Sequence, residues 1–587
     1  PSRHKMLEQV QDNVSLGAIA ERVLQKNHAE IYAEFLQNHQ TTDNDRMRIG
    51  EDIRGWQPSP LISVIMPVFN TPGRFLRAAV DSVVCQLYGH WELCIVDDAS
   101  DNPETLDCLA ALDDPRIKIR RLETGRNISA ATNAGIAMAA GTYIAFLDHD
   151  DSLHEAALYA MVREIQAGDW DLLYSDEDFM DEEGVRVHAH FKPDFSPQLL
   201  EAHNYITHLV VVRRSLAEQV GLLRSEFDGA QDYDFLLRVS SLTRKIWHIP
   251  KVLYHWRMSD TSTAKSSEAK PETTDLGRRA LLDYLHQKNQ SGEVRECNLP
   301  NYYEIHRHID KHPKVSIVIP FKDRPDLLQR CVRSILERRT YTNIEIIGVS
   351  NNAELSSTFA MMDQLSEHPE VRFVERNVPF NFSDLVNFGV AESDGEVAVL
   401  MNNDIEIISW DWIERMLEHA VQSDIGAVGG KLFYPDNTIQ HAGVIVGIGG
   451  YAGHAFKGFR GNAAGYYNLL NITCNYAAVT GAFMMIERSK YEQLGGFDAK
   501  QFKVACNDVD FCLRLLEQGY YNVYTPFAKA YHWESLSRGY EDTPAKKRRF
   551  TIEKAQFCER HKRILERGDP FYNANLTLDE ENFGLAG

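Results

Sequence analysis

The chain has 587 residues, of which 44% are hydrophobic and 25% are charged, and its net charge is −22. These proportions are typical of soluble globular proteins, and the length exceeds what a single hydrophobic core supports. The negative charge argues against a nucleic-acid-binding protein, because phosphate binding requires a basic surface.

The nine cysteines are scattered and form no C-x-x-C pair, which favours a reducing compartment. No segment approaches the roughly 18 consecutive apolar residues of a membrane-spanning helix, and residues 1–5 do not look like a signal peptide. We therefore predict a cytoplasmic protein, with peripheral contact to a membrane surface as an alternative.

Taken in chain order, the sequence predicts five segments. Apolar-periodic stretches at 16–24 and 31–36, followed by a polar break at 38–46, indicate a small helical leader, and Pro58-Ser59-Pro60 marks its end. The segments are the leader (1–58), a first large domain (59–260), a linker with a helix (261–312), a second large domain (313–540) and a tail with a helix and an extended end (541–587). The polar residues 259–274 predict a flexible loop.

The first large domain alternates strand-like and helix-like patterns. We expect strands at 61–66, 92–96, 172–178, 207–213 and 246–256, and helices at 75–86, 130–139 and from about 229 onward. Alternation with acidic or turn residues at the strand ends is typical of a doubly wound, mostly parallel α/β sheet.

The second large domain repeats the first. Val315–Pro320 matches Ile62–Pro67, and Asp150 matches Asp404 at an offset of about 254 residues. From Asp232 to Asp508 the offset is about 276 residues, so the second copy contains an insertion of about 22 residues. We place it in the glycine-rich stretch 443–465, because loops over the carboxyl ends of strands commonly set specificity.

An acidic cluster follows the apolar stretch 143–147. In a parallel sheet, ligands bind at the carboxyl ends of the strands. Clustered carboxylates are costly there unless a positive group neutralises them, most simply a divalent metal on a phosphate ester. We predict Asp150 as a ligand of Mn²⁺ or Mg²⁺ and Asp148 as a ligand of the metal or the substrate. The alternative is a loop that caps a helix at 153–164.

Two further positions carry candidate chemistry. Asp232 precedes the apolar face of a helix and is either a general base or an N-cap. A helix N-terminus lowers a carboxyl pKa, so a base at this position needs burial or neighbouring carboxylates to raise it. His255, in Tyr254-His255-Trp256, is either a metal ligand or a packed strand residue.

All three features recur in the same order in the second half, as Asn402-Asn403-Asp404, Asn507–Phe511 and Tyr531-His532-Trp533. Recurrence favours function, because three unrelated structural features would have to repeat together by chance.

These motifs resemble inverting family-2 glycosyltransferases with the GT-A fold, of the bacterial polysaccharide and O-antigen type. The matching stretches in the first half are Val64–Asn70, Val96–Ser100, Arg126-Asn127, Asn133–Gly135, Asp148–Asp150 and Gln231–Asp234. In the second half they are Val318–Pro325, Leu400–Asp404, Asn507–Phe511, His532–Gly539 and Asp569–Asn573, and this half resembles rhamnosyl- and galactofuranosyl-type transferases. The fold implied is two GT-A domains in tandem, each Rossmann-like with a doubly wound, mostly parallel sheet.

The resemblance implies a role for each matched residue. Asp232 and Asp508 would be the catalytic bases. Asp150, His255, Asp404 and His532 would hold or face the metal and diphosphate. The donor would be bound by Pro67, Asn70, Asp98, Arg126 and Asp148 in the first half, and by Pro320, Asn351, Asn402 and Arg538 in the second. Residues 174–178 would be either a sugar-contacting loop or a plain acidic turn.

The second half departs from the family pattern at two positions. Ser350-Asn351 stands where the first half has Asp97-Asp98, which removes the usual nucleotide-contacting acid. Asn402 replaces the first acid of the metal motif. The resembling subgroup commonly tolerates the second change. The first predicts a different nucleotide or weaker donor binding in the second half.

The expected function is a bifunctional inverting glycosyltransferase that uses nucleotide-diphosphate sugars, UDP- or dTDP-linked, and Mn²⁺ or Mg²⁺. The acceptor would be a lipid-linked oligosaccharide of a bacterial cell-surface polysaccharide. Alternatives are one active domain beside a degenerate, acceptor-positioning domain, and a non-catalytic glycan-binding scaffold. The basic run Lys546–Arg549 predicts a solvated helix face, or contact with a phosphate-bearing acceptor or the inner face of the bacterial plasma membrane.

Overall fold

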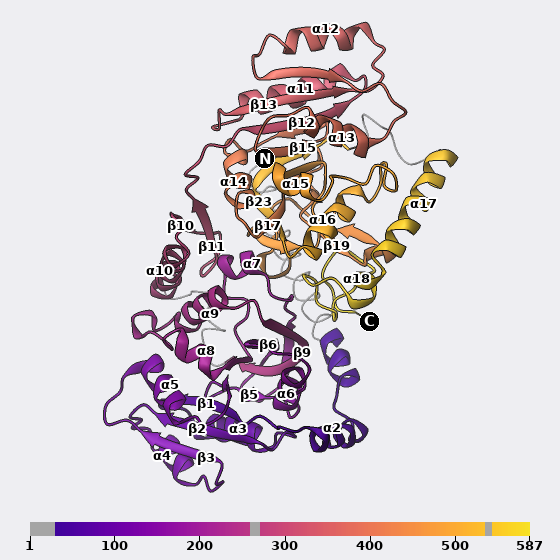
Figure 1. Cartoon of the computed structure of the whole chain (residues 1–587). Coiled ribbons are helices and arrows are strands. Elements are labelled where there is room, and N and C mark those ends of the chain that lie inside the picture. The colour runs from indigo at the N-terminus through magenta and orange to yellow at the C-terminus, as the bar shows by residue number, and fades with distance from the viewer. Residues whose placement is uncertain (1–29, 259–270, 535–542, 587) are drawn as a thin grey trace, which may run out of the picture. The chain divides into compact units, whose positions relative to one another are not determined.

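The structure is a computed structural model (Figure 1), and it describes residues 30–258, 271–534 and 543–586. The chain forms two compact units. Within the described residues, unit 1 comprises 30–192, 206–258 and 271–280, and unit 2 comprises 193–205, 281–534 and 543–586. Residues 193–205 of unit 2 therefore interrupt unit 1 in the sequence.

Unit 1 contains one nine-stranded sheet in the order β3-β2-β1-β4-β8-β6-β9-β5, with β7 paired to β6. Its strands are β1 (Ile62–Val68), β2 (Trp91–Asp97), β3 (Ile117–Arg121), β4 (Tyr143–Phe146), β5 (Ser152–Leu153), β6 (Leu172–Met180), β7 (Arg186–His190), β8 (Val210–Arg213) and β9 (Ile246–Arg257). Its helices are α2 (Asp43–Gly55), α3 (Gly73–Val84), α4 (Pro103–Ala110), α5 (Asn127–Met138), α6 (Ala157–Ala167), α8 (Arg214–Gln219), η1 (Ser225–Phe227) and α9 (Gln231–Leu242).

Unit 2 contains a ten-stranded sheet in the order β14-β13-β12-β15-β22-β17-β23-β16, with β18 on β17 and β21 on β23. The strands are β12 (Val315–Phe321), β13 (Ile344–Ser350), β14 (Val371–Glu375), β15 (Val397–Met401), β16 (Ile405–Ile407), β17 (Ile425–Phe433), β18 (Ile439–His441), β21 (Cys474–Tyr476), β22 (Phe483–Glu487) and β23 (Tyr521–His532). Two smaller sheets pair β10 (Gly292–Glu296) with β11 (Tyr303–Arg307), and β19 (Val444–Val446) with β20 (Ala452–His454).

The helices of unit 2 are α7 (Pro197–Ala202), α11 (Pro325–Glu337), α12 (Ser356–Leu365), α13 (Phe382–Ala391), α14 (Trp412–Ala420), η2 (Ile448–Gly450), η3 (Tyr466–Asn468), α15 (Arg488–Gln493), α16 (Asn507–Glu517), α17 (Pro544–Arg560) and α18 (Lys562–Arg567). Helix α10 (Pro271–Gln287) crosses the division between the units.

The two large sheets have the same strand order, which is the duplication that the sequence predicts. In each, three parallel pairs join four consecutive strands of the order, and antiparallel pairing begins at β8 in unit 1 and β22 in unit 2. The α/β fold class with two tandem sheets is thus confirmed. Alternate residues of β12 enter different cores, since Val315, Ile317 and Ile319 belong to one cluster and Val318 to the other. Burial of both faces is typical of a doubly wound sheet.

The repeated Asn and Gly positions have the same structural role in both units. Asn133 accepts from and donates to the backbone of Leu223, and Asn387 does the same with Phe497. A Cβ at Gly135 would lie 2.7 Å from Ile65 Cγ2, so only glycine lets α5 approach β1 this closely. Their recurrence reflects packing rather than chemistry.

The structure differs from the expected elements in three places. Residues 38–46 are not one polar break, because α2 begins at Asp43 with a capping box between Thr42 and Asp45. The helix expected at 153–164 begins at Ala157, because Ser152 and Leu153 pair with β9 as strand β5. Residues 174–178 form neither a loop nor a turn but the middle of the buried strand β6.

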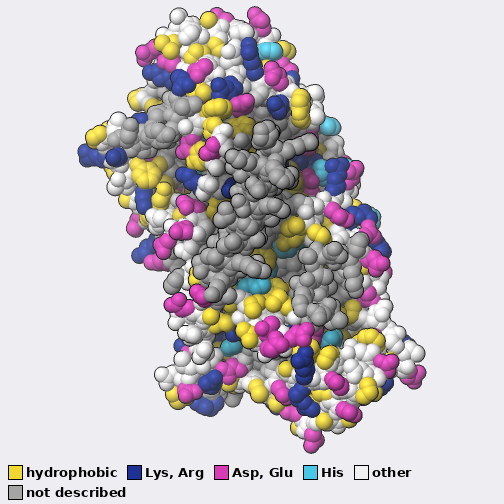
Figure 2. All heavy atoms as spheres, turned by 180° about the vertical axis from the view of Figure 1, so that it is seen from behind, with side chains coloured by type: hydrophobic (Ala, Val, Ile, Leu, Met, Phe, Trp, Pro, Cys, Tyr) yellow, Lys and Arg dark blue, Asp and Glu magenta, His cyan; other side chains and the backbone are white. Residues whose placement is uncertain are grey.

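The predicted leader and tail pack onto the units. Ile49 of α2 lies in the unit 1 core, and Phe557 of α17 and Phe571 lie in a unit 2 core. The leader helix expected at 16–24 and residues 259–270 of the predicted loop lie outside the described residues, whereas residues 271–274 begin α10 and do not continue the loop. On the face drawn in Figure 2, acidic and basic side chains are interspersed with hydrophobic ones. Among the described helices, none combines the length and apolar character needed to cross a membrane.

Candidate functional sites

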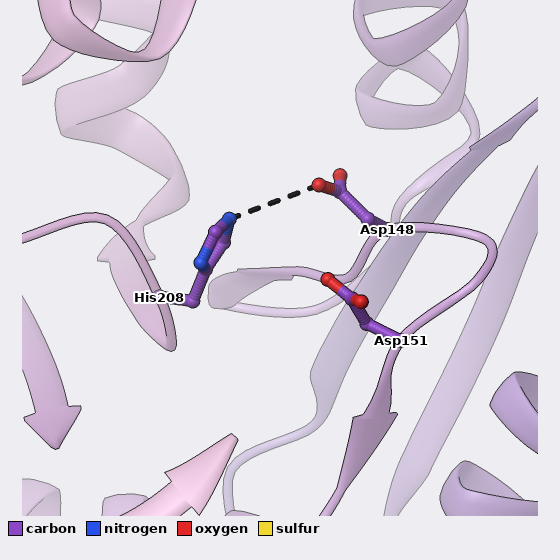
Figure 3. Close-up of side chains that lie close together, drawn as sticks. All are labelled: Asp148, Asp151 and His208. Carbon is purple, nitrogen blue, oxygen red and sulfur yellow. Dashed lines mark ion pairs between the residues drawn. The ribbon is translucent and has the colours of Figure 1, made fainter. Parts of the chain in front are cut away.

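A cluster of possible metal ligands lies at the carboxyl end of β4 in unit 1. Asp148, Asp151 and His208 each present a ligand atom, and these atoms all lie within 4.8 Å of one another. His208 Nε2 is 3.7 Å from Asp148 Oδ2. Figure 3 shows the two carboxylates and the imidazole turned toward one another, with His208 on a separate segment from the two acids. Carboxylate oxygens suit Mn²⁺ or Mg²⁺, and an imidazole nitrogen suits transition-metal ions.

The orientation of His208 is fixed by Glu177 of β6. Glu177 is buried, and its carboxylate is 3.1 Å from His208 Nδ1 and 3.3 Å from Lys192 Nζ. It also accepts from Thr207 Oγ1 at 2.7 and 2.8 Å. Because Nδ1 faces Glu177, Nε2 is left to face the acids, as in the carboxylate–histidine arrangement that orients metal ligands.

The negative charges around His208 stabilise its protonated form. Burial alone would lower the pKa of His208, but its hydrogen bond to Glu177 and the charges of Glu177, Asp148 and Asp151 raise it to about 9. Burial raises the pKa of Asp151 well above its ordinary value, helped by the neighbouring Asp148 and Asp150. A protonated His208 and a divalent cation are alternative neutralisers of these acids, so cation binding would release a proton.

Sheet register gives Asp151, rather than Asp150, the position of Asp404. Ser152 pairs with His255 in unit 1, and Ile405 pairs with His532 in unit 2. The acid directly before each of these residues is therefore Asp151 in one unit and Asp404 in the other. The constant offset of about 254 residues aligned Asp150 with Asp404. In register, however, Ser152 follows Tyr143 by nine positions in unit 1, whereas Ile405 follows Val397 by eight in unit 2.

The structure places Asp150 and His255 outside the Asp148–Asp151–His208 cluster. Asp150 Oδ1 is 3.6 Å from His149 Nδ1. His255 Nδ1 is 2.6 Å from Asp178 Oδ1, and Asp178 Oδ2 accepts a 2.6 Å hydrogen bond from the hydroxyl of Tyr32. His255 is thus tied to a buried carboxylate of β6, which gives it a structural partner.

Asp232 lies at the first turn of α9 and lines a cavity of about 90 Å³ with Pro67, Asp148 and His208. The side chain is exposed at this cavity. Desolvation nevertheless raises its pKa, and the charge of Asp148 adds to the rise against the backbone hydrogen bond from Tyr233 and the charge of His208. The net direction is the one that a general base at a helix N-terminus needs.

Two other residues of unit 1 that were predicted to bind the donor, Asn70 and Asp98, accept hydrogen bonds from backbone amides. Asn70 Oδ1 accepts from the amides of Asp101 and Asn102. Asp98 accepts from the amides of Arg126 and Asn127 at 2.8 and 2.9 Å. Arg126 itself is exposed at the start of α5. These residues shape the loops at the carboxyl ends of β1 and β2.

Unit 2 has a larger cavity of about 580 Å³ at the same edge of its sheet. The predicted residues that line it are Pro320, Asn351, Asn402, Asp404, Asp508 and His532. The tertiary structure therefore brings six predicted positions from five separate stretches into one site. Arg538, the seventh, lies outside the described residues.

Asp404 and His532 form the candidate metal ligands of unit 2. His532 Nε2 is 3.3 Å from Asp404 Oδ1 and 3.4 Å from Asn402 Nδ2. Both Asp404 and His532 are buried. Asn402 replaces a carboxylate without leaving the site, since an amide oxygen is also a suitable ligand for a hard cation.

Asp508 lies at the start of α16 and accepts from the amides of Gly481 and Val509, each at 2.9 Å. Burial raises its pKa, and these backbone hydrogen bonds oppose the rise. The two candidate bases thus share a position at the first turn of a helix and the direction of their pKa shift.

Several residues at these sites were missed by the sequence analysis. Register aligns Tyr143 with Val397, and their partners Arg213 with Glu487, so Ala482 stands in unit 2 where His208 stands in unit 1. A search for repeated features could not find a histidine that only one copy has. Gln440 and His454 also line the unit 2 cavity. Strand β20, which carries His454, has no described counterpart in unit 1, whereas β18, which carries Gln440, pairs with β17 as β7 pairs with β6.

Comparison with known proteins gives the family. The model of glycosyl transferase family 2 matches residues 63–221 and 316–495, one stretch in each unit. The chain is 42% identical over 546 residues to an uncharacterized protein of Sinorhizobium fredii, covering 92% of this chain and 60% of that protein. It is 37% identical over 530 residues to an O-antigen biosynthesis protein of Myxococcus xanthus, covering 90% of this chain and 41% of that protein.

Among solved structures, the chain is similar to Staphylococcus aureus TarS in complex with UDP-GlcNAc, with 18% identity and a TM-score of 0.33 over 38% of this chain and 66% of that one. A mannosyltransferase of Pyrobaculum calidifontis, in complex with GDP-Man and Mn²⁺, matches with 16% identity and a TM-score of 0.33 over 50% of this chain and 76% of that one. The two family matches together span more than half of the chain, and the protein belongs to glycosyl transferase family 2.

Proposed function

We propose that this family-2 glycosyltransferase has two transfer sites, one in each of its expected domains at 59–260 and 313–540, and that each forms one glycosidic linkage. One observation carries the proposal. In both units, an acid after the fourth strand of the sheet shares a cavity with an acid at the first turn of a later helix. The pairs are Asp148 with Asp232 and Asp404 with Asp508.

The reaction proposed is a single displacement at the anomeric carbon of a nucleotide-diphosphate sugar. Asp232 or Asp508 takes the proton of the acceptor hydroxyl as its oxygen attacks, and the bond to the diphosphate breaks. Their raised pKa values make both carboxylates stronger bases than an ordinary Asp. One displacement inverts the anomeric configuration, and the mechanism needs no covalent sugar–enzyme intermediate.

The residues present fit a divalent cation in both units. Asp148, Asp151 and His208 would hold it in unit 1, and Asp404 and His532 in unit 2. Bound there, Mn²⁺ or Mg²⁺ supplies Lewis-acid stabilisation of a diphosphate leaving group. The orienting contact from Glu177 to His208 supports this assignment, because metal-binding histidines generally carry such a partner.

The substrates proposed are UDP- or dTDP-sugars and a lipid-linked oligosaccharide of a bacterial surface polysaccharide. The family and the O-antigen biosynthesis relative support this class. The chain spans 60% and 41% of the two relatives' lengths, so the whole-protein activity is part of the proposal. The basic residues Arg548 and Arg549 line a cavity with Lys500 and Lys503, which supports a phosphate-bearing acceptor at the tail.

A second candidate is one active site beside a unit that only positions the acceptor. In that case unit 2 is the active one, because a single cavity of about 580 Å³ gathers Asp404, Asp508 and His532 there.

The test is transfer from a panel of UDP-, dTDP- and GDP-sugars to lipid-linked acceptors with Mn²⁺ or Mg²⁺, for wild type, Asp232→Asn and Asp508→Asn. Loss of a different linkage in each variant supports two sites. Loss in Asp508→Asn alone supports the second candidate. No transfer and no donor hydrolysis by any form of the protein would refute the transferase proposal.

A further inference from the structure

The unit 2 cavity has a polar wall that combines His454, from the stretch 443–465 where an insertion is expected, with Gln440, which precedes that stretch. His454, the last residue of β20, and Gln440 of β18 both line this cavity, as do Asp404 and Asp508. Strand β20 pairs only with β19 among the described strands, and the described sheet of unit 1 has no equivalent hairpin. The β20 part of the wall, which carries His454, therefore distinguishes unit 2 from unit 1.

A chain of hydrogen bonds fixes the tautomer of His454. The amide of Thr480 donates to His441 Nε2 at 3.4 Å, so that nitrogen is an acceptor and the proton of a neutral His441 is on Nδ1. His441 Nδ1 lies 2.8 Å from His454 Nδ1 and must donate to it. The proton of a neutral His454 is then on Nε2, where it is available as a donor.

Both imidazoles are neutral near pH 7. Burial holds the pKa of His441 well below its ordinary value, and the neighbouring His454 and His532 add to the effect. Burial lowers the pKa of His454 to about 4, with a further decrease from the charge of Lys457. The wall thus offers an uncharged N–H group.

Gln440 supplies the complementary group. It is 4% exposed, and its Oε1 has no hydrogen-bond partner among the described residues. A buried acceptor without a partner is costly unless a ligand satisfies it. An acceptor and a neutral donor on one cavity wall match a sugar hydroxyl, which both donates and accepts, whereas a phosphate oxygen only accepts and would leave Oε1 without a partner.

We propose that Gln440 and His454 form a hydroxyl-recognition subsite of the unit 2 cavity, and that His441 is a positioning residue that sets the tautomer of His454. The inference rests on the proposed function, because it assigns a sugar to that site. The hydroxyl belongs either to the sugar of the nucleotide donor or to the terminal sugar of the acceptor, and the test distinguishes these sources.

The experiment uses the full chain with Mn²⁺ and measures KM and kcat for the linkage that Asp508→Asn abolishes, varying donor and acceptor separately. Binding of UDP, dTDP and GDP without a sugar is measured by calorimetry for the same proteins. The variants are Gln440→Leu, His454→Leu and His454→Gln, the last of which retains an N–H donor.

We expect Gln440→Leu and His454→Leu to raise KM about 10- to 100-fold for one substrate. A site that hydrogen-bonds a hydroxyl loses much of its affinity for the substrate when one of the protein partners is removed. Binding of the nucleoside diphosphate should change less than about twofold, and His454→Gln should restore much of the loss. A rise in donor KM identifies the donor sugar, and a rise in acceptor KM identifies the acceptor sugar.

His441 is tested by a double-mutant cycle. His441→Leu should raise the same KM in wild type but have little effect in the His454→Gln background, where the donor no longer depends on an imidazole tautomer. Equal effects in both backgrounds would refute the positioning role.

Three other results would overturn the subsite. They are unchanged KM values for both substrates, equal weakening of the sugar-free nucleotide, and a fall in kcat alone. If the wild-type protein binds nucleotides but transfers nothing from any donor, the proposed function fails, which is a different result from failure of the subsite.

Discussion

Asp98 in unit 1 and Asn351 in unit 2 hold the same loop with opposite hydrogen-bond polarity. Each follows the second strand of its sheet, and its amide donates to the end of the first strand, at Val68 or Phe321. Asp98 then accepts from the amides of Arg126 and Asn127. Asn351 instead donates to the carbonyls of Arg376 and Val378, at 2.7 and 2.8 Å. The change of acid to amide therefore preserves the loop.

This polarity predicts that Asp98 cannot be replaced by Asn, nor Asn351 by Asp, without loss of stability. Asp98→Asn turns an NH₂ group toward a backbone amide, and Asn351→Asp turns a carboxylate toward two carbonyl oxygens. Each should cost about 1–3 kcal/mol in free energy of unfolding, as expected for a buried polar group left unpaired. Chemical denaturation measures it. Asn352→Asp is the control, because Asn352 is exposed and donates to the same Val378 carbonyl; a cost as large as that of Asn351→Asp would contradict the argument.

The register of the acidic loops predicts which acid of unit 1 binds metal. Asp151→Asn should remove one Mn²⁺ site from the full chain, as counted by electron paramagnetic resonance titration, whereas Asp150→Asn should leave the count unchanged. Glu177→Gln should weaken the same site about 10- to 100-fold, because the carboxylate that orients His208 would be lost. The opposite ranking of Asp150 and Asp151 would refute the assignment.

The helical residues 30–38 are tied to the core of unit 1 through Tyr32. Its hydroxyl donates to the buried Asp178, which also binds His255. Tyr32→Phe should lower the free energy of unfolding by about 1.5–3 kcal/mol, the usual value for a hydrogen bond to a charged group. Tyr159→Phe is a matched control, since Tyr159 donates to Asp52 at the same 2.6 Å in a less buried place. Equal losses in urea unfolding would contradict the role of burial.

Asp569 predicts a pH dependence of stability. Burial raises its pKa to about 7 in unit 2, although the amides of Val446 and Phe571 donate to it. Asp569 therefore keeps its proton in the folded protein at pH values where the unfolded chain, with a carboxyl pKa of about 4, has released it. Its contribution to the free energy of unfolding falls as pH rises from about 4 to about 7. As pH rises across this window, the free energy of unfolding of Asp569→Asn should increase relative to that of wild type by up to about 1.4 kcal/mol per pH unit.

The measurement is denaturant unfolding at pH 4.5, 5.5, 6.5 and 7.5. Asp579→Asn, at an exposed position of the same tail, should give a difference from wild type that does not vary with pH. A pH-independent difference for Asp569→Asn would show that the carboxyl titrates normally in the folded protein.

The sequence alone predicted the fold class, the duplication and most of the candidate residues that line the unit 2 cavity. Strand and helix periods, and acids at strand ends, are local properties of the sequence. A pattern that occurs in both halves, such as Asp404, Asp508 and His532 with their counterparts, can be recognised without a structure. The three unit 2 residues do line one cavity. The glycine and asparagine landmarks were also visible in the sequence. Only the structure shows that the glycines allow close packing on β1 and β12 and that the asparagines bond to the backbone of Leu223 and Phe497.

Only the tertiary structure decided which side chains meet. Asp150 and Asp151 are adjacent in sequence, and the pairing of β5 with β9 selects Asp151 as the counterpart of Asp404. His208 joins Asp148 because antiparallel pairing of β8 brings its preceding loop to the end of β4. The tautomer of His454 depends on two hydrogen bonds between distant segments. Contacts of this kind arise from strand register and loop closure, which no local pattern of residues encodes.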